Sequence, residues 1–166
     1  IKVSKNNVLE ITKQNETKKG GYVYLIRAIY PENVKATFST KDGKAKVELD
    51  FEISQEIDYI EADKNVNKFI ILGENKILNE NLIKFFPETT TEREIKYELK
   101  ENYQGISLID NQIIFDDPNN PEILLNGQAQ TKIYLTAKHI KFNENLSQEE
   151  KDKLFVDDIE FDVLYS

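Results

Sequence analysis

Two pairs of adjacent aspartates are the residues of this sequence best suited to bind a cation. A calcium ion takes six to eight oxygen ligands, and paired carboxylates supply several of them at once. Aspartate and asparagine also stabilise β-turns without any metal, and the spacing here matches no EF-hand loop. Both interpretations therefore stand, with calcium as the only cofactor to consider. The candidate metal ligands are Asp116, Asp117, Asp157 and Asp158, and Asn119, Asn120 and Glu122 follow the first pair.

His139 is the only histidine, and Lys138 precedes it. A catalytic imidazole needs an orienting carboxylate and a nucleophile, and the spacing of the chain nominates neither. We expect a half-exposed residue at the end of a strand. Phosphate loops, dinucleotide fingerprints, zinc-ligand spacings and nucleophile elbows are also missing from the sequence. The sequence therefore predicts a protein that is not an enzyme.

Three aromatic residues, Phe85, Phe86 and Tyr103, could stack on sugar rings if loops expose them. Adjacent phenylalanines before a proline are more typical of a buried plug, and we favour that interpretation for Phe85 and Phe86. Two charged stripes, Glu48/Asp50/Glu52 and Glu160/Asp162, are expected to face solvent and to discourage strand pairing at a sheet edge. A ligand-binding role is the alternative for the stripes.

These residues lie in a sequence dominated by a period of two, which predicts half-buried strands. Residues 46–54, 94–100 and 131–140 alternate apolar with polar residues, and residues 68–73 and 111–116 are short apolar runs typical of buried strands. Residues 21–30 are apolar on both faces, which predicts a strand covered on two sides. One short helix is expected at 147–155, where Ser147 and Glu150 fit a capping box. The fold class is therefore all-β.

The composition limits the classes of partner that the protein can bind and indicates its source organism. The net charge of −8 and the pI near 4.8 argue against nucleic acid, and no apolar run approaches the length of a membrane-spanning helix. Cysteine is absent, so disulfides and thiolate chemistry are excluded. Twenty lysines against two arginines indicate an A/T-rich genome and thus a low-GC bacterium. A chain that starts at Ile1 is expected to be a fragment or a processed protein.

The same alternating phrase occurs twice, at 46–54 and at 158–166. Two further blocks agree in the same order, 22–28 with 132–138 and 1–9 with 106–114, so we predict an internal repeat. A unit of this length suits a whole domain. Residues 55–166 would form a complete unit, and residues 1–54 would form the later half of another, with about 50 residues missing before Ile1. A half-sandwich should pack against something, either the 55–105 region or a neighbouring chain.

The order of "YELKEN", "GISLIDNQIIF", "TKIYLTAKH" and "IEFDVLYS" over residues 94–166 resembles bacterial immunoglobulin-like repeats of surface proteins. Their frequent tryptophan before the first hairpin is absent here, and Tyr97 takes its place. The resemblance implies an antiparallel β-sandwich in tandem units. It also implies a secreted or cell-surface protein or lipoprotein that acts as a spacer or adhesion module beside neighbouring domains of its own polypeptide. The alternatives are a domain that binds a glycan or a host protein, and an accessory domain of a larger secreted enzyme.

Overall fold

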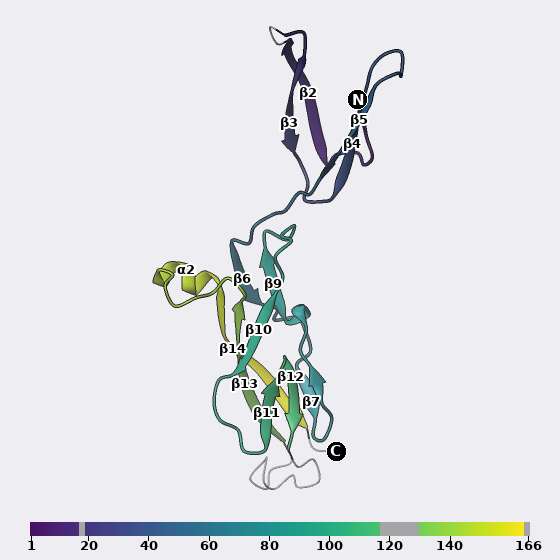
Figure 1. Ribbon diagram of the computed structural model, residues 1–166. Helices are drawn as coiled ribbons and strands as arrows, with labels where there is room; N and C mark the ends of the chain where they lie inside the picture. The colour runs from purple at the N-terminus through teal and green to yellow at the C-terminus, as the bar shows by residue number, and fades with distance from the viewer. Residues whose placement is uncertain (17–18, 117–129, 165–166) are drawn as a thin grey trace. The chain divides into compact units, whose positions relative to one another are not determined.

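The structure is a computed structural model that describes residues 1–16, 19–116 and 130–164, and nearly all of its regular elements are β-strands (Figure 1). The predicted all-β class is therefore confirmed. The chain divides into two compact units, residues 1–56 with 89–92, and residues 57–88 with 93–166. Residues 89–92 belong to the first unit, because the Thr90 hydroxyl and the Thr91 N–H donate to the Gln55 carbonyl at 2.9 and 3.1 Å.

The first unit contains two antiparallel sheets. One has the order β1-β4-β5, and the other is the hairpin β2-β3. Alternation in the sequence sets the register of β4 and β5, where Ala36 lies opposite Leu49. The small core forms where the sheets face each other, around Val8, Leu9 and Val34. The strands are β1 (Lys2–Val3), β2 (Leu9–Glu16), β3 (Tyr22–Ala28), β4 (Val34–Ser39) and β5 (Lys46–Phe51).

The second unit is larger and is built like a β-sandwich. Its elements are β6 (Tyr59–Ala62), β7 (Phe69–Ile71), β8 (Lys76–Ile77), the 3-10 turn η1 (Glu80–Leu82), β9 (Ile83–Phe86), β10 (Ile95–Leu99), β11 (Ile106–Ile109), β12 (Gln112–Phe115), β13 (Gln130–His139), α2 (Gln148–Lys153) and β14 (Phe155–Leu164). They form a sheet of order β10-β13-β14-β7, a sheet of order β11-β12-β8, and the pair β6-β9. All pairs are antiparallel except β7 with β14, which is parallel.

The core of the second unit follows from strict alternation in β13 and β14. Ile133, Leu135 and Ala137 of β13 are fully buried, and so are Ile159 and Phe161 of β14. The side chains between them point away from the core. The alternation of β14 breaks once, because Asp157 and Asp158 together oppose the single residue Thr136 and form a β-bulge. The bulge is why Val156 and Ile159, three residues apart, are both buried.

The predicted helix is confirmed as α2, with Ser147 as its N-cap. The Glu150 N–H donates to the Ser147 hydroxyl at 3.3 Å, and the Ser147 N–H donates to the Glu150 carboxylate at 2.9 Å. These two hydrogen bonds make the predicted capping box. Among the described residues, α2 is the one α-helix, and it interrupts the connection from β13 to β14.

Residues 21–30 are not covered on two sides, so that prediction is wrong. They form β3, which pairs only with β2 among the described strands. Val23 and Leu25 of its outer face are exposed, Leu25 to 60%, and Tyr22 on the opposite face is exposed as well. Apolar residues on both faces of a strand do not require cover on both sides, because a strand with one free face can have the same composition.

The matched sequence blocks do not all form corresponding strands in the structure. Residues 46–51 and 158–164 form the last described strand of each unit, and each pairs antiparallel with the strand before it. Residues 22–28 lie in β3, in a two-stranded sheet, whereas residues 132–138 lie in β13, inside a four-stranded sheet. Residues 106–114 form a hairpin, whereas β1 and β2 of residues 1–9 do not pair. Of the three matches, only that of 46–54 with 158–166 joins strands that occupy corresponding positions in the two units.

Candidate functional site

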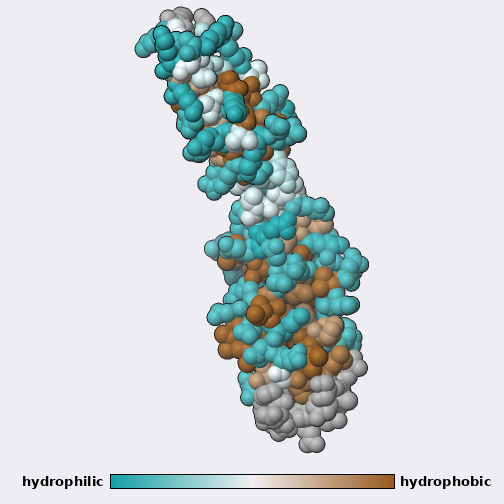
Figure 2. Space-filling model, turned by 90° about the vertical axis from the view of Figure 1, so that its right-hand side faces the viewer, coloured by the Kyte–Doolittle hydropathy of each residue, from teal (hydrophilic) through white to brown (hydrophobic). Residues whose placement is uncertain are grey.

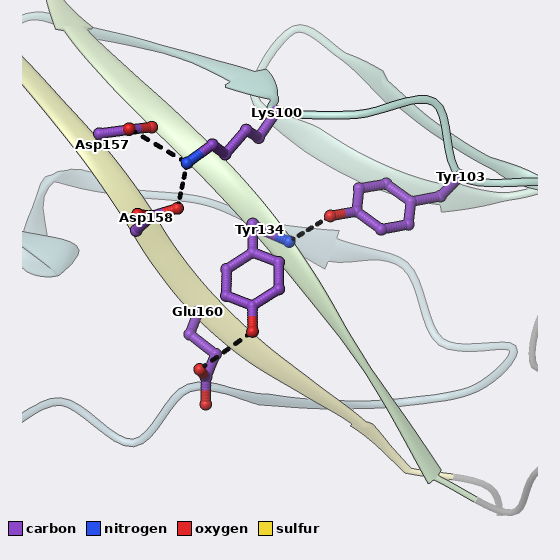
Figure 3. Close-up of polar contacts among 6 residues, drawn as sticks. All are labelled: Lys100, Tyr103, Tyr134, Asp157, Asp158 and Glu160. Carbon is purple, nitrogen blue, oxygen red and sulfur yellow. Dashed lines mark hydrogen bonds and ion pairs between the residues drawn. The ribbon is translucent and has the colours of Figure 1, made fainter.

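The aspartate pair of β14 binds a lysine of its own unit. The Lys100 ammonium lies 3.1 Å from an Asp157 carboxylate oxygen and contacts an Asp158 carboxylate oxygen as well (Figure 3). The hydrogen bonds to the two aspartates raise the pKa of Lys100. Asp158 has a positive φ of 58°, which the β-bulge imposes. A cation is therefore already present at this pair, and a calcium ion would have to displace it.

The other aspartate pair is described only in part. Asp116 follows β12, and its carboxylate accepts a hydrogen bond from the Ser107 hydroxyl at 3.2 Å. Asp117, Asn119, Asn120 and Glu122 lie outside the described residues. Within the described ranges, no three acidic, histidine or cysteine side chains converge as a metal site would require. If calcium binds, adding a chelator should lower the melting temperature, whereas unchanged melting in excess chelator would remove the ion.

His139 is buried, with 1% of its surface exposed, so the expected half-exposed position is wrong. The strand β13 continues to this residue, and the following chain folds over it. The backbone N–H of His139 donates to the Leu154 carbonyl at 2.9 Å, and its Nδ1 accepts from the Lys141 N–H at 3.2 Å. The imidazole is thus part of the packing that holds the segment before α2.

The aromatic candidates are used inside the second unit. Phe85 is buried in the core, which confirms the plug interpretation for this residue. Phe86 is half-buried and stacks on Tyr59 with ring centroids 4.5 Å apart. The Tyr103 hydroxyl accepts the Tyr134 backbone N–H at 2.8 Å (Figure 3). Tyr103 therefore braces β13 instead of standing free on a loop.

The charged stripes form cross-strand ion pairs on outer sheet faces. In the first unit, the Lys35 ammonium lies 3.6 Å from Glu48 and 3.7 Å from Asp50. In the second unit, Lys132 contacts Glu160 and lies 3.5 Å from Asp162. Opposite charges on neighbouring strands support the register, at modest energy because the side chains are exposed.

A different place emerges as the best candidate for ligand binding. A groove of about 710 Å³ opens in the first unit, between the turn ends of the β2-β3 and β4-β5 hairpins. We call it the tip groove. The small core lies at the other end of the hairpins, so the tip groove is where the two sheets separate. Its lining residues are Lys13, Tyr22, Tyr24, Phe38, Ser39, Thr40, Lys41, Ala45, Lys46 and Val47.

Aromatic rings and an ammonium group form the walls of the tip groove. Tyr24 of β3 packs on Phe38 of β4, with ring centroids 5.3 Å apart and an interplanar angle of 57°. The Lys13 ammonium lies 3.7 Å from the centre of the Tyr22 ring, a cation–π contact. Apolar surface of this unit shows between hydrophilic residues on the face drawn in Figure 2. Aromatic faces beside cations suit ligands that combine apolar and anionic groups.

The β4-β5 turn beside the tip groove is held by hydrogen bonds of its own. The Lys44 and Ala45 N–H groups donate to Asp42 and to the Thr40 hydroxyl, each at 3.1 Å. The hydrogen bond from the Thr40 hydroxyl, and then the one from Lys44, lower the pKa of Asp42. Gly43 has a φ of +70°, which an L side chain rarely adopts. These bonds fix the turn that carries Lys41, and Lys46, which also lines the groove, follows it as the first residue of β5.

Charge is distributed unequally between the units. Residues 1–56 contain ten Lys and Arg against eight Asp and Glu, whereas residues 57–166 contain twelve against twenty-two. The first segment thus carries +2 and the second −10. An anionic group should approach the tip groove more readily than the second unit.

The tip groove was not predicted from the sequence, although the sequence contains one signal of it. The two-faced apolar character of residues 21–30 indicated more apolar surface than one sheet contact can bury. The groove joins Tyr22 and Tyr24 of one sheet to Phe38 and Val47 of another, and local spacing in the sequence does not reveal that these sheets pack together.

A second hollow, of about 400 Å³, lies in the second unit beside α2. Its lining mixes Ile57, Leu146 and Leu154 with Asp58, Glu150 and Lys153, and the Lys153 ammonium pairs with Glu149 at 2.7 Å. It holds no aromatic ring, so it offers less for recognition than the tip groove.

Among the described residues, no helix has the length and apolar character needed to cross a lipid bilayer. No protein-family model matches the chain, and neither does any curated protein sequence.

Proposed function

We propose that the chain is a non-catalytic, immunoglobulin-like module of a secreted or cell-surface bacterial protein. The order of strands in the second unit carries the proposal. In an immunoglobulin-like sandwich, strands C, F and G share one sheet while A, B, E and D share the other. The sheet β10-β13-β14 fits C-F-G, and the sheet β11-β12-β8 fits D-E-B, because β8 lies beside β12 as strand B lies beside strand E.

The first unit supports the tandem arrangement with the same logic. Its sheet β1-β4-β5 has the order of β10-β13-β14, first, fourth and fifth in each series of five strands. Its hairpin β2-β3 takes the place of β11-β12. Residues 1–56 thus correspond to the strands C to G, the later half of a unit, and strands equivalent to A and B are not among them.

A module of this kind either separates neighbouring domains or binds a partner. A sandwich core leaves turns and sheet edges free to vary, which suits contact with partners outside the cell. Protease treatment of intact cells of the encoding organism tests the location, since a surface module should be cleaved while a cytoplasmic marker survives. Full protection of the chain in intact cells, with cleavage after lysis, would contradict the proposal.

The tip groove favours a second candidate, a domain that binds a glycan or a host protein. Tyr22, Tyr24 and Phe38 offer rings, and Lys13 and Lys41 offer cations for acidic sugars. A glycan array and a pull-down from serum separate the candidates, because a binding domain gives a saturable ligand and a spacer gives none. Tyr24→Ala should abolish the binding of a ligand held in the tip groove. The third reading, an accessory domain of a larger secreted enzyme, predicts a catalytic domain in the same polypeptide.

A further inference from the structure

The pair β7-β14 is the one parallel pair among the described strands. At one end of the pair, the Asp162 N–H donates to the Lys68 carbonyl at 2.9 Å. At the other end, the Leu72 N–H donates to the Leu164 carbonyl at 2.7 Å. β7 is an early strand of the second unit, and β14 is its last described strand. The pair therefore joins segments from the two ends of the unit's sequence.

The parallel direction decides how a pull along the chain acts on this pair. The chain enters β7 at the Lys68 end and leaves β14 at the Leu164 end, which are opposite ends of the pair. Tension along the chain therefore pulls the two strands lengthwise in opposite directions. The evenly spaced hydrogen bonds of a parallel pair then share the force, whereas a pull on both strands at one end would break them one at a time.

β7 is held by the hydrophobic core as well as by hydrogen bonds. Ile70 and Leu72 are buried in the same core as Phe161 of β14, whereas Phe69 on the other face of β7 is 49% exposed. Sliding β7 along β14 must expose Ile70 and Leu72 to water at the same moment as the hydrogen bonds break. The two contributions to resistance therefore act together.

β14 is anchored more firmly than β7, which determines the strand that separates first. On its other side, β14 pairs with β13 all the way from Gln130 to Lys138. β7 pairs with β14 only from Phe69 to Ile71. A pull that overcomes the fold therefore removes β7 from β14 while β14 stays on β13, and the resistance of the unit is that of the β7-β14 pair.

We propose that the second unit bears tension along the polypeptide, and that the β7-β14 pair is the element that resists it. This role rests on the proposed function for the source of the force, because a spacer at a cell surface is pulled at both ends when its partner moves. The resistance itself belongs to the fold. It depends on the direction of the pull and on the barrier to forced unfolding, and not on equilibrium stability alone.

The test is single-molecule force spectroscopy on the full 166-residue chain, which has no cysteine, so introduced cysteines define the attachment points. Lys64→Cys with Ser166→Cys pulls β7 and β14 in shear, because Lys64 precedes β7 and bypasses β6. Glu74→Cys with Ser166→Cys pulls at the end where Leu72 meets Leu164, which peels the same pair apart. Lys64 and Glu74 are both exposed. At equal pulling speed, the first form should unfold at a severalfold higher force.

Two matched variants separate the pair from the core in general. Ile70 of β7 and Ile106 of β11 are isoleucines of the same core, 3% and 6% exposed. Ile70→Ala and Ile106→Ala should lower stability in chemical denaturation by similar amounts, because each leaves a cavity. Only Ile70→Ala should lower the unfolding force in the shear geometry. Ile70→Val and Ile106→Val repeat the comparison at a smaller loss of stability, in case an alanine variant does not fold.

Two results would overturn the proposal. Equal unfolding forces for the two attachment geometries would show that the parallel pair gives no directional resistance. An equal loss of force in Ile106→Ala and Ile70→Ala would assign the resistance to the whole core. Either result leaves the proposed surface module standing, because both are measured on the purified chain. Protection of the chain in intact cells would instead contradict the surface module and leave the measured forces unchanged.

Discussion

The last strands of the two units share a sequence pattern and differ in their surroundings. In β14 the alternating apolar residues Ile159, Phe161 and Val163 are fully buried. In β5 the matching positions hold Val47 and Leu49, which are exposed, and Phe51, which is half-buried. Alternation determines which residues share a face of a strand. Whether that face is buried depends on strands elsewhere in the chain or in another chain.

This difference should appear as a difference in stability. Burial of apolar surface is the main favourable contribution to folding, at roughly 25 cal/mol per Å². Among the described residues, eighteen buried hydrophobic residues cluster in the core of the second unit, whereas the core cluster of the first unit consists of Val8, Leu9 and Val34. We therefore expect the first unit to open more readily than the second, unless a partner covers β5.

The largest expected effect is at the two matched strand positions, Phe161 and Leu49. Phe161→Ala should destabilise the second unit by about 3–5 kcal/mol, because it leaves a cavity at a fully buried position. Leu49→Ala should cost the first unit roughly 1 kcal/mol or less, because much of that side chain already contacts water. Hydrogen exchange read separately over β14 and β5 measures both.

Equal losses of stability for Phe161→Ala and Leu49→Ala would contradict the difference in burial between β14 and β5. They would mean that a second molecule already covers Leu49 in solution. Repeating the measurement at low protein concentration separates this case, since a cover supplied by a second copy dissociates on dilution.

The next largest effect is expected at Asn111, which ties the β11-β12 turn to β10. Its side-chain amide donates to the Ile95 carbonyl and accepts the Tyr97 N–H, both at 2.9 Å. Its φ is 59°. Asn111→Ala should cost about 2–3 kcal/mol, from two lost hydrogen bonds and a strained backbone. Chemical denaturation with exchange over β10 measures the loss.

Asn111→Gly is the matched control, because glycine accepts the positive φ but offers no amide. Its cost should be smaller than that of Asn111→Ala by about 1 kcal/mol. If the two variants were equally destabilised, the backbone conformation would contribute nothing, and the hydrogen bonds alone would hold the turn.

Local signals in the sequence predicted the elements well. Period-two alternation predicted β5, β10 and β13, and the capping box at Ser147 predicted α2, because both act over a few residues. The burial of His139 could not be predicted in this way. It depends on the chain at Leu154, fifteen residues further on, which accepts the His139 N–H.

The candidate site was harder to predict for the same reason. The aspartate pairs drew attention because they are adjacent in sequence, yet Asp157 and Asp158 bind Lys100, 57 and 58 residues away in the chain. The tip groove joins residues of two hairpins, and its residue types are ordinary when read singly. Only sheet packing brings the rings of Tyr24 and Phe38 together.

A smaller effect is expected at Tyr97 under alkaline conditions. Its hydroxyl donates to the Asn79 carbonyl at 2.7 Å, and burial, followed by the nearby Glu80 charge, raises its pKa well above the usual range. The unfolded state therefore loses the Tyr97 proton at a lower pH than the folded state does. The stability that this hydroxyl contributes is fully present below about pH 10 and is lost as the pH rises above it. Tyr97→Phe should cost about 1 kcal/mol at pH 8 and flatten the alkaline loss of the second unit. Melting curves from pH 8 to 11 measure this, and a variant as sensitive to alkali as the parent would contradict it.

The smallest effect concerns an ion pair on the outer face of each unit. Hydrogen bonds from Lys138 and then Lys96, each at 3.1 Å, lower the pKa of Glu98. The Lys46 ammonium, 2.6 Å away, does the same for Glu48 in the first unit. A lowered carboxyl pKa stabilises the fold above about pH 4.3 and is lost as the pH falls through the folded value. Glu98→Gln should therefore reduce acid sensitivity in the second unit alone, by a fraction of a kcal/mol because solvent screens the pair. Amide hydrogen-exchange rates over β10 and over β5, measured between pH 3 and 6, show whether the change is confined to the second unit. If Glu98→Gln also changed the acid sensitivity of β5, the two units would not be independent in stability, and their difference in burial could not be assigned to β5 alone.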